Sequence, residues 1–164
     1  MGVLSKLCKN RGITRIRGKN NNVTILENGK KVGSKRLAGL RIDVKGEGNQ
    51  ITIHLPQKFE NCRLIVRGNN NICEFGATDK FSKDTNYYLD SKANGREVKI
   101  GRDFMCAGAD MIVALEGSKF SIGDGCMFSY QVQIRNHDGH TLFDKKTKKP
   151  LHGSREMHIG DRVW

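Results

Sequence analysis

The chain has 164 residues, enough for one domain with a sizeable core and too few for a second full domain. Nineteen glycines against two prolines, with 7% aromatic and 28% charged residues, are typical of a turn-rich soluble β-protein. No stretch has the apolar length that spans a membrane, and the first twenty residues lack the continuous apolar segment of a secretory signal, so we expect a cytoplasmic protein.

The five cysteines are an odd number and form no CxxC pair: Cys8, Cys62, Cys73, Cys106 and Cys126. This pattern favours neither a disulfide framework nor a zinc site. We expect free thiols that pack as small apolar groups, a reducing compartment and no bound metal ion.

The net charge of +12 is unevenly distributed along the chain. Residues 1–58 hold thirteen Lys and Arg against three acids, a balance of +10, whereas residues 59–164 hold sixteen against fourteen, a balance of +2. The N-terminal third therefore carries a basic face. Such a face binds nucleic acid, an anionic membrane surface or an acidic glycan, or is simply solvated.

Three similar stretches come first along the chain: RIRGKNNNVTI at 15–25, DVKGEGNQITI at 43–53 and IVRGNNNICEF at 65–75. Each has apolar and basic residues, a glycine, a polar turn rich in asparagine, and then alternating apolar residues. The first apolar residues after the turns, Val23, Ile51 and Ile72, are aligned at spacings of 28 and 21. Because Asn and Gly tolerate the left-handed backbone conformation, these turns suit tight corners between short strands.

Three hexads that begin Ile-Gly follow: IGRDFM at 100–105, IGDGCM at 122–127 and IGDRVW at 159–164. Ile100 and Ile122 are 22 residues apart, while Ile122 and Ile159 are 37 apart. If one coil takes about 22 residues, an extra loop of roughly fifteen residues lies before Ile159. Short strands at this period predict a β-solenoid, with the hairpins of a β-sandwich as the alternative.

The segment IGDGCMFSYQVQIRNHDGHTLFD…MHIGDRVW, residues 122–164, resembles the hexapeptide-repeat acyltransferases, and among them the sugar and polysaccharide O-acetyltransferases. The likeness covers 100–164 closely and 15–75 only in architecture. It implies an all-β, left-handed parallel β-helix with an excursion loop near 140–157. The single domain, 1–164, would comprise an N-terminal segment (1–14), basic irregular coils (15–99) and catalytic hexapeptide-repeat coils (100–164).

In that family a histidine just before the excursion is the catalytic base, and the Asp-Gly-His motif puts it at His140. A sugar hydroxyl is a poor nucleophile near neutral pH, so its attack on the thioester of acetyl-CoA needs a base such as imidazole. Asp138 would orient and stabilise the imidazole, or is an ordinary turn residue. Direct transfer needs no Cys or Ser nucleophile.

Other residues take weaker assignments from the resemblance. His137 is the alternative candidate for the base, or contacts the acceptor substrate. Asn136, next to the motif, is a candidate for contact with the acceptor, as are Asp110 and Tyr130 about one coil earlier and Trp164 at the return from the excursion. Each has a purely structural alternative. Lys145 and Lys146 are candidates for binding the phosphates of coenzyme A, or are a solvated part of the loop.

The resemblance implies acetyl transfer from acetyl-CoA to a hydroxyl of a sugar or cell-surface polysaccharide, in a homotrimer. Relatives continue for several coils beyond the position of Trp164, and those coils carry most of the coenzyme A groove, so we expect this chain to be truncated. The alternative is therefore a non-catalytic β-solenoid that serves in assembly. A nucleic-acid partner is disfavoured, since three tyrosines and one tryptophan offer few stacking platforms.

Overall fold

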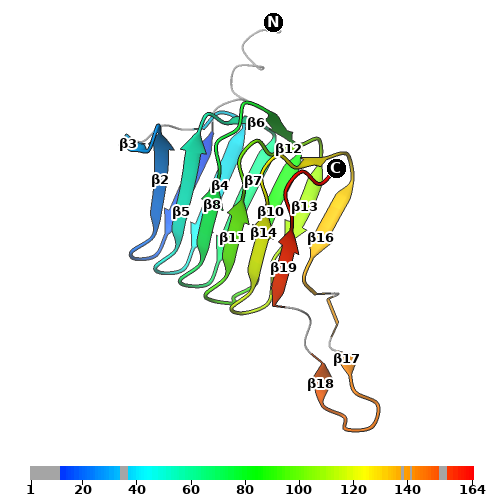
Figure 1. Cartoon of the computed structure of the whole chain (residues 1–164). Helices are drawn as coiled ribbons and strands as arrows, with labels where there is room; N and C mark the ends of the chain where they lie inside the picture. Colours follow the sequence, from blue (N-terminus) through cyan, green and yellow to red (C-terminus); the bar gives the residue numbers. More distant parts are fainter. Residues whose placement is uncertain (1–11, 34–36, 138, 141, 152–154) are drawn as a thin grey trace, which may run out of the picture.

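A computed structural model describes residues 12–33, 37–137, 139–140, 142–151 and 155–164. Within these residues every regular element is a β-strand, and the strands stack into a parallel β-helix with a hairpin projecting from its last coil (Figure 1). The predicted all-β solenoid is confirmed. Among the described residues there is no helix long and apolar enough to cross a membrane.

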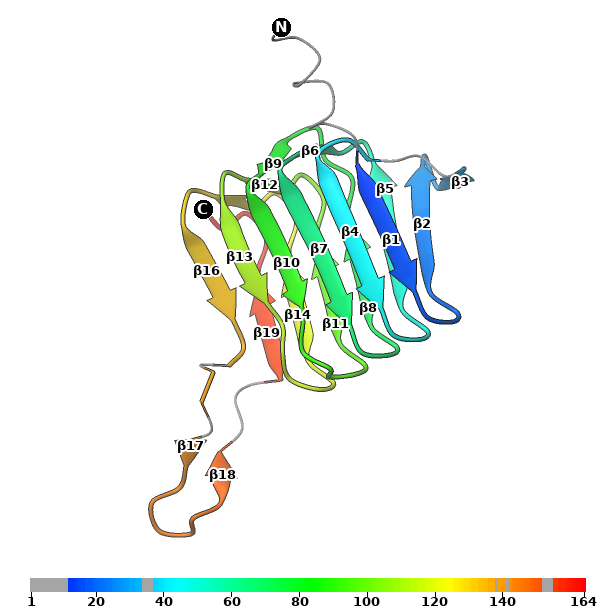
Figure 2. The same ribbon diagram turned by 180° about the vertical axis from the view of Figure 1, so that it is seen from behind.

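Three parallel sheets form the sides of the solenoid. Sheet A, in spatial order, contains β1 (Ile13–Arg17), β4 (Leu40–Lys45), β7 (Cys62–Arg67), β10 (Thr85–Leu89), β13 (Ala109–Ile112) and β16 (Val132–Arg135). Sheet B contains β19 (Glu156–Ile159), β14 (Lys119–Ile122), β11 (Glu97–Ile100), β8 (Ile72–Phe75), β5 (Gln50–Leu55), β2 (Asn22–Glu27) and the antiparallel edge strand β3 (Lys30–Val32). Sheet C contains β15 (Met127–Phe128), β12 (Met105–Cys106), β9 (Phe81–Lys83) and β6 (Lys58–Glu60). Figure 2 shows sheet A from outside.

Alternate residues of each strand point into the solenoid and form a continuous apolar core. On sheet A the register aligns Ile42 with Leu64, Leu64 with Tyr87 and Tyr87 with Met111, and all four are at most 3% exposed. A stacked column of this kind is stabilised by the burial of each apolar side chain against the coils above and below it. Four of the cysteines, Cys62, Cys73, Cys106 and Cys126, are free thiols in this core, as predicted.

The register confirms one of the two repeat alignments and corrects the other. Ile100 pairs with Ile122, and Ile122 with Ile159, as the hexads predict. Val23 pairs with Ile51, but Ile51 pairs with Cys73 rather than with Ile72, which is 48% exposed. The prediction at Ile72 was wrong by one residue because each corner takes a different number of residues, and a slip of one reverses the face of a strand.

The corner between sheets A and B is held by a ladder of asparagines, of which Asn49 and Asn71 are buried and Asn21 is half-buried. Asn21 Oδ1 accepts a hydrogen bond from Asn49 Nδ2 at 2.8 Å, and Asn49 Oδ1 accepts one from Asn71 Nδ2 at 2.8 Å. The neighbouring glycines allow the corners to stack, since a Cβ on Gly46 would overlap the carbonyl oxygen of Gly68. The Asn-Gly runs therefore form corners, as the sequence predicts.

Arg96 continues this ladder at the next corner and is fully buried. Its Nε donates to Asn71 Oδ1 at 2.9 Å. Its two terminal nitrogens donate to Ser91 Oγ and to four backbone carbonyl oxygens, those of Arg67, Leu89, Ser91 and Val113. Burial lowers the pKa of Arg96 to about 10, yet the guanidinium stays charged at neutral pH. It links neutral groups of several coils without a carboxylate among these acceptors.

The excursion leaves the last coil between β16 and β19. It carries the antiparallel hairpin of β17 (Leu142–Phe143) and β18 (Pro150–Leu151), which projects away from the solenoid in Figures 1 and 2. The predicted loop near 140–157 is present, but β16 already ends at Arg135 and β19 begins at Glu156. The return strand pairs with β14, so the solenoid continues after the hairpin in its earlier register.

Candidate functional site

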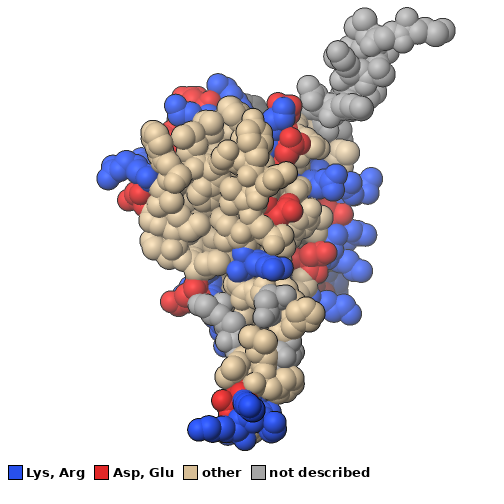
Figure 3. Space-filling model, turned by 90° about the vertical axis from the view of Figure 1, so that its right-hand side faces the viewer, with Lys and Arg blue, Asp and Glu red and all other residues tan. Residues whose placement is uncertain are grey.

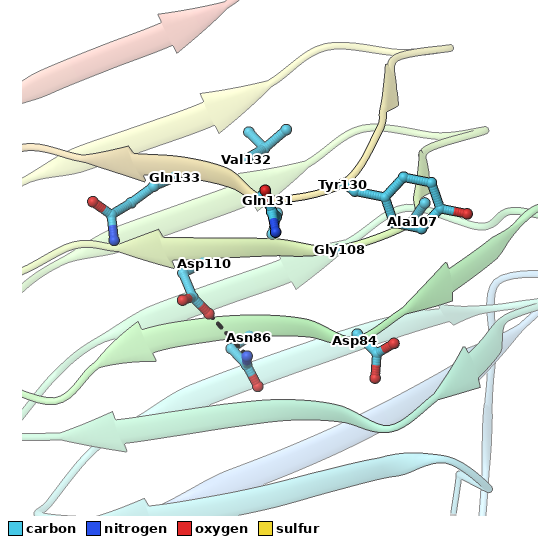
Figure 4. A pocket seen from close by; sticks show the side chains of 10 residues that line it. Asp84, Asn86, Ala107, Gly108, Asp110, Tyr130, Gln131, Val132 and Gln133 are labelled. Atoms are coloured by element: carbon cyan, nitrogen blue, oxygen red, sulfur yellow. Dashed lines mark hydrogen bonds between the residues drawn. The ribbon is translucent and has the colours of Figure 1, made fainter.

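An open pocket of about 600 Å³ lies on the outer face of sheet A, across the starts of β10, β13 and β16. Its lining residues are Asp84, Asn86, Ala107, Gly108, Ala109, Asp110, Tyr130, Gln131, Val132 and Gln133. Figure 4 shows the acidic, amide and aromatic side chains around it. Because the three strands are parallel neighbours, residues from three successive coils meet at this place.

Register pairs build the polar floor of the pocket. Asn86 aligns with Asp110, and Asp110 with Gln133, so one outward column carries an amide, a carboxylate and a second amide. Asn86 Nδ2 donates to Asp110 Oδ1 at 2.8 Å, which fixes the orientation of the carboxylate (Figure 4). Carboxylate and amide groups of this kind accept and donate hydrogen bonds to sugar hydroxyls.

Tyr130 stands at the rim of the pocket and is 73% exposed. A tyrosine presents an apolar ring face together with a polar hydroxyl, so Tyr130 offers both kinds of contact at the rim of the pocket. The structure thus places two of the predicted substrate-binding residues, Asp110 and Tyr130, in one pocket. Their partners Asp84, Asn86, Gln131 and Gln133 were missed from the sequence, although the spacing of 24 residues between Asn86 and Asp110 is close to one coil.

The predicted general base lies elsewhere, beyond the other end of β16. His140 is exposed and lies on the segment that connects β16 with the hairpin. Asp138, its predicted partner, is outside the described residues. His137 is half-buried, and its Nδ1 accepts a hydrogen bond from the backbone N–H of Gly139 at 2.9 Å, so this imidazole supports the turn before His140.

Asn136, another predicted substrate contact, is buried at the corner between β16 and the excursion. Its Nδ2 donates to Ser118 Oγ at 2.7 Å, and its Oδ1 accepts from the backbone N–H of Ala114 at 3.0 Å. Both ends of the amide are therefore used within the fold. A contact with substrate would require one of these bonds to break.

The remaining predicted residues lie at the hairpin tip and at the chain end. Lys145 and Lys146 are exposed in the turn between β17 and β18, where Asp144 Oδ1 accepts from the backbone N–H groups of Lys146 and Thr147. The bonds from Thr147 and Lys146 hold the pKa of Asp144 below its usual value. Figure 3 shows Lys and Arg side chains gathered at this tip. Trp164 is 85% exposed.

Within one chain, the structure does not bring all the predicted residues together. The segment between β16 and β17 leaves the lower end of sheet A, whereas the chain end, marked C, lies near the opposite end of the strands (Figures 1 and 2). The pocket at Asp110 and Tyr130 lies at the start of β16, and His140 follows its end.

His158, a histidine outside the predictions, makes a short contact on sheet B. Ser121 Oγ and His158 Nδ1 are 2.6 Å apart, on register partners of β14 and β19. The pair could not be recognised in the sequence, because the two residues are 37 positions apart and the excursion lies between them. Both side chains lie on the outer face of the sheet, away from the pocket on sheet A.

Comparison with known proteins gives three informative similarities. No protein-family model matches the chain. The chain is 24% identical over 147 residues to the polysialic acid O-acetyltransferase of Neisseria meningitidis. The aligned region covers 90% of this chain and 53% of the relative. It is 34% identical over 70 residues to the polysialic acid O-acetyltransferase of Escherichia coli O1:K1 / APEC, covering 43% of this chain and 22% of the relative. The chain thus spans about half the length of the Neisseria relative, and less of the other.

The fold also matches a solved structure. The crystal structure of the polySia specific acetyltransferase NeuO superposes with a TM-score of 0.64, over 92% of this chain and 61% of that chain, at 20% sequence identity. This match confirms the solenoid architecture. The two sequence relatives confirm the predicted resemblance to polysaccharide O-acetyltransferases.

Proposed function

Because the chain resembles polysialic acid O-acetyltransferases in sequence, we propose that it transfers an acetyl group from acetyl-CoA to a hydroxyl of an acidic cell-surface polysaccharide. The observation that carries this proposal is the placement of His140, an exposed imidazole at the base of the excursion in the part of the chain with the family-like sequence. The supply of acetyl-CoA places the reaction in the cytoplasm.

His140 is the proposed general base. Its ring nitrogen accepts the proton of the acceptor hydroxyl while that oxygen forms a bond to the acetyl carbon and the carbon–sulfur bond breaks. The imidazolium then returns the proton to the departing thiolate, which leaves as the free thiol. An imidazole suits both steps, because it ordinarily titrates near neutral pH. Acetyl-CoA supplies the activated acetyl group as a thioester.

The lysines of the hairpin tip fit the phosphates of coenzyme A in charge. Lys145 and Lys146 are exposed. Their ammonium groups are positively charged and act only as hydrogen-bond donors. In this proposal they attract the phosphates, while His137 holds the turn that presents His140.

The acceptor occupies the pocket that holds Asp110 and Tyr130 on sheet A. Because the two ends of β16 separate this pocket from His140, and the end at Trp164 lies apart from the excursion, a complete site needs a second copy of the chain. A homotrimer, in which the pocket of one copy faces the excursion of another, provides this arrangement. Sedimentation velocity tests it: a monomer that retains full transferase activity would contradict it.

The decisive experiment measures the free thiol released from acetyl-CoA in the presence of polysialic acid and a panel of neutral and acidic saccharides. His140→Ala should lower the rate about 10²- to 10⁴-fold, the usual contribution of a general base. His54→Ala is a matched control, since His54 lies on β5 and pairs with Glu74 at 3.4 Å. Equal activity of the wild type and His140→Ala would refute the mechanism, and a wild-type chain inactive on every acceptor would refute the proposed function.

A further inference from the structure

The outer face of sheet A carries six cations on its first three strands: Arg15 and Arg17 on β1, Arg41 and Lys45 on β4, and Arg63 and Arg67 on β7. We call these six residues the basic face. All are exposed except the half-buried Arg67. One acid, Asp43, lies among them. In Figure 3, Lys and Arg side chains line the right-hand edge, the side that carries sheet A.

The register of these strands places like charges next to one another. Arg41 aligns with Arg63. Lys45 aligns with Arg17 on one side and with Arg67 on the other. Neighbouring strands are about 4.8 Å apart, so each alignment holds two cations side by side. Like charges at directly facing positions of a sheet destabilise it.

Sheet B has the opposite arrangement and shows that the fold itself does not require this repulsion. There Lys119 aligns with Glu97 and Glu156, and Lys99 aligns with Glu74. Opposite charges thus face each other on sheet B, where the same solenoid geometry applies. An anion bound over sheet A would reduce this repulsion.

Asp43 neutralises only part of the basic face and fixes its geometry. Its Oδ1 lies 2.8 Å from Arg17 Nη2 and 3.4 Å from Arg67 Nη1, and its side chain is 8% exposed. Burial by itself raises the pKa of Asp43, but the hydrogen bond from Arg17 and the charge of Arg67 outweigh it and hold the pKa below its usual value. With Asp43 ionised, the six cations keep a balance of five positive charges, and Asp90, whose Oδ1 lies 3.6 Å from Arg67 Nε, offsets one of these.

The basic face leads directly into the pocket. Arg63 is the register partner of Asn86, which lines the pocket and is itself the partner of Asp110. One outward column therefore runs from Arg41 on β4 through Arg63 on β7 to the polar floor on β10 and β13. Figure 2 shows these four strands side by side in this order. With a strand spacing of about 4.8 Å, Asp110 is about 14 Å from Arg41 and about 19 Å from β1.

We propose that the basic face binds a polyanionic saccharide chain, with a carboxylate on each sugar, whose neighbouring residue enters the pocket at Asp110 and Tyr130. This inference rests on the proposed function and adds to it the surface that holds the acceptor chain. A single sugar reaches only the pocket, whereas a longer chain also reaches the arginines, so affinity rises with chain length. The alignment of carboxylate, amide and tyrosine with the basic face favours a saccharide over a nucleic acid.

The test measures binding rather than transfer, so that it is independent of catalysis. Fluorescently labelled polysialic acid is titrated with His140→Ala protein at several salt concentrations. The double variant Arg41→Gln/Arg63→Gln is added in the same background. Each cation beside an anionic surface raises affinity about fivefold. Loss of two cations should therefore raise the Kd of the double variant for polysialic acid about 30-fold at low salt, and should make that Kd less dependent on salt.

The matched control is Lys99→Gln/Lys119→Gln, which removes the same charge from sheet B and should bind as the parent does. Equal binding by both double variants would overturn the inference, as would tighter binding of single-stranded DNA than of a saccharide of equal charge. Salt-dependent binding that is lost in Arg41→Gln/Arg63→Gln, in a chain that transfers no acetyl group, would support the basic face and refute the proposed function. Circular dichroism confirms that each variant is folded.

Discussion

Replacement of the buried Arg96 by Met should destabilise the solenoid strongly, although Met has a similar length and no charge. The guanidinium makes six side-chain hydrogen bonds, to Asn71 Oδ1, to Ser91 Oγ and to four backbone carbonyl oxygens. A hydrogen bond contributes about 1 kcal/mol net, so the loss is about 6 kcal/mol. These acceptors would then be buried with fewer donors.

Part of this loss is offset, because the wild-type protein buries a charge. Burial lowers the pKa of Arg96 to about 10, and at about 1.36 kcal/mol per pKa unit this lowering corresponds to about 3 kcal/mol. Arg96→Met removes this cost, so the net destabilisation should be about 3 kcal/mol. Arg96→Lys keeps the charge and three donors, loses about three bonds and should be destabilised by a similar amount.

Urea unfolding followed by circular dichroism measures both variants. With a slope of about 1–3 kcal/mol per molar urea, a loss of 3 kcal/mol lowers the midpoint by about 1–3 M. A midpoint within 0.2 M (roughly the error of such a comparison) of the wild type for Arg96→Met would show that the ladder is not a source of stability. A fully stable Arg96→Lys would refute the requirement for the planar, many-donor guanidinium.

Three further predictions concern other described residues. Asp43→Asn should be less stable than the wild type at neutral pH. Because the pKa of Asp43 is lowered in the folded state, this difference in stability is present above about pH 3.8 and disappears as the pH falls through the folded-state pKa. Urea midpoints of both proteins from pH 7 to 3 measure the difference. A difference that stays constant over this range would contradict the pairing of Asp43 with Arg17. Burial raises the pKa of Cys62 to about 11 and that of Cys73 to about 12, so neither thiol should react with iodoacetamide at pH 8 until urea unfolds the chain. Mass spectrometry counts the modified thiols. Rapid alkylation of these two cysteines in the native protein would show that the core opens. Asn136→Ala should lower stability by about 1–3 kcal/mol without changing KM; a higher KM at unchanged stability would instead support its predicted contact with substrate.

The local signals of the sequence determined the type of fold and the position of the catalytic candidate. Asn-Gly runs specify corners, because only such residues adopt the left-handed backbone there without strain; Asn20 and Asn70 have φ of 56° and 54°. Alternating apolar residues specify the inward faces of strands. The 37-residue gap before Ile159 gave the excursion, and the Asp-Gly-His motif gave His140 at its base. The corners and the inward faces follow from neighbouring residues, the excursion follows from the spacing of the repeats, and His140 follows from the resemblance to the acyltransferases.

The tertiary structure alone decided which distant residues meet. The corner ladder joins residues 28, 22 and 25 positions apart, from Asn21 to Asn49, Asn71 and Arg96, so no single period gives the register. A slip of one residue exchanges the inner and outer faces of a strand, which is why Ile72 was misplaced. Successive coils contain different numbers of residues, yet each places its strand directly beside the strand of the coil before it. The pocket at Asp110 and the facing pair Arg41 and Arg63 exist only because of this stacking. Contacts between coils depend on the length of every corner between them, and residue types within one coil do not determine that length.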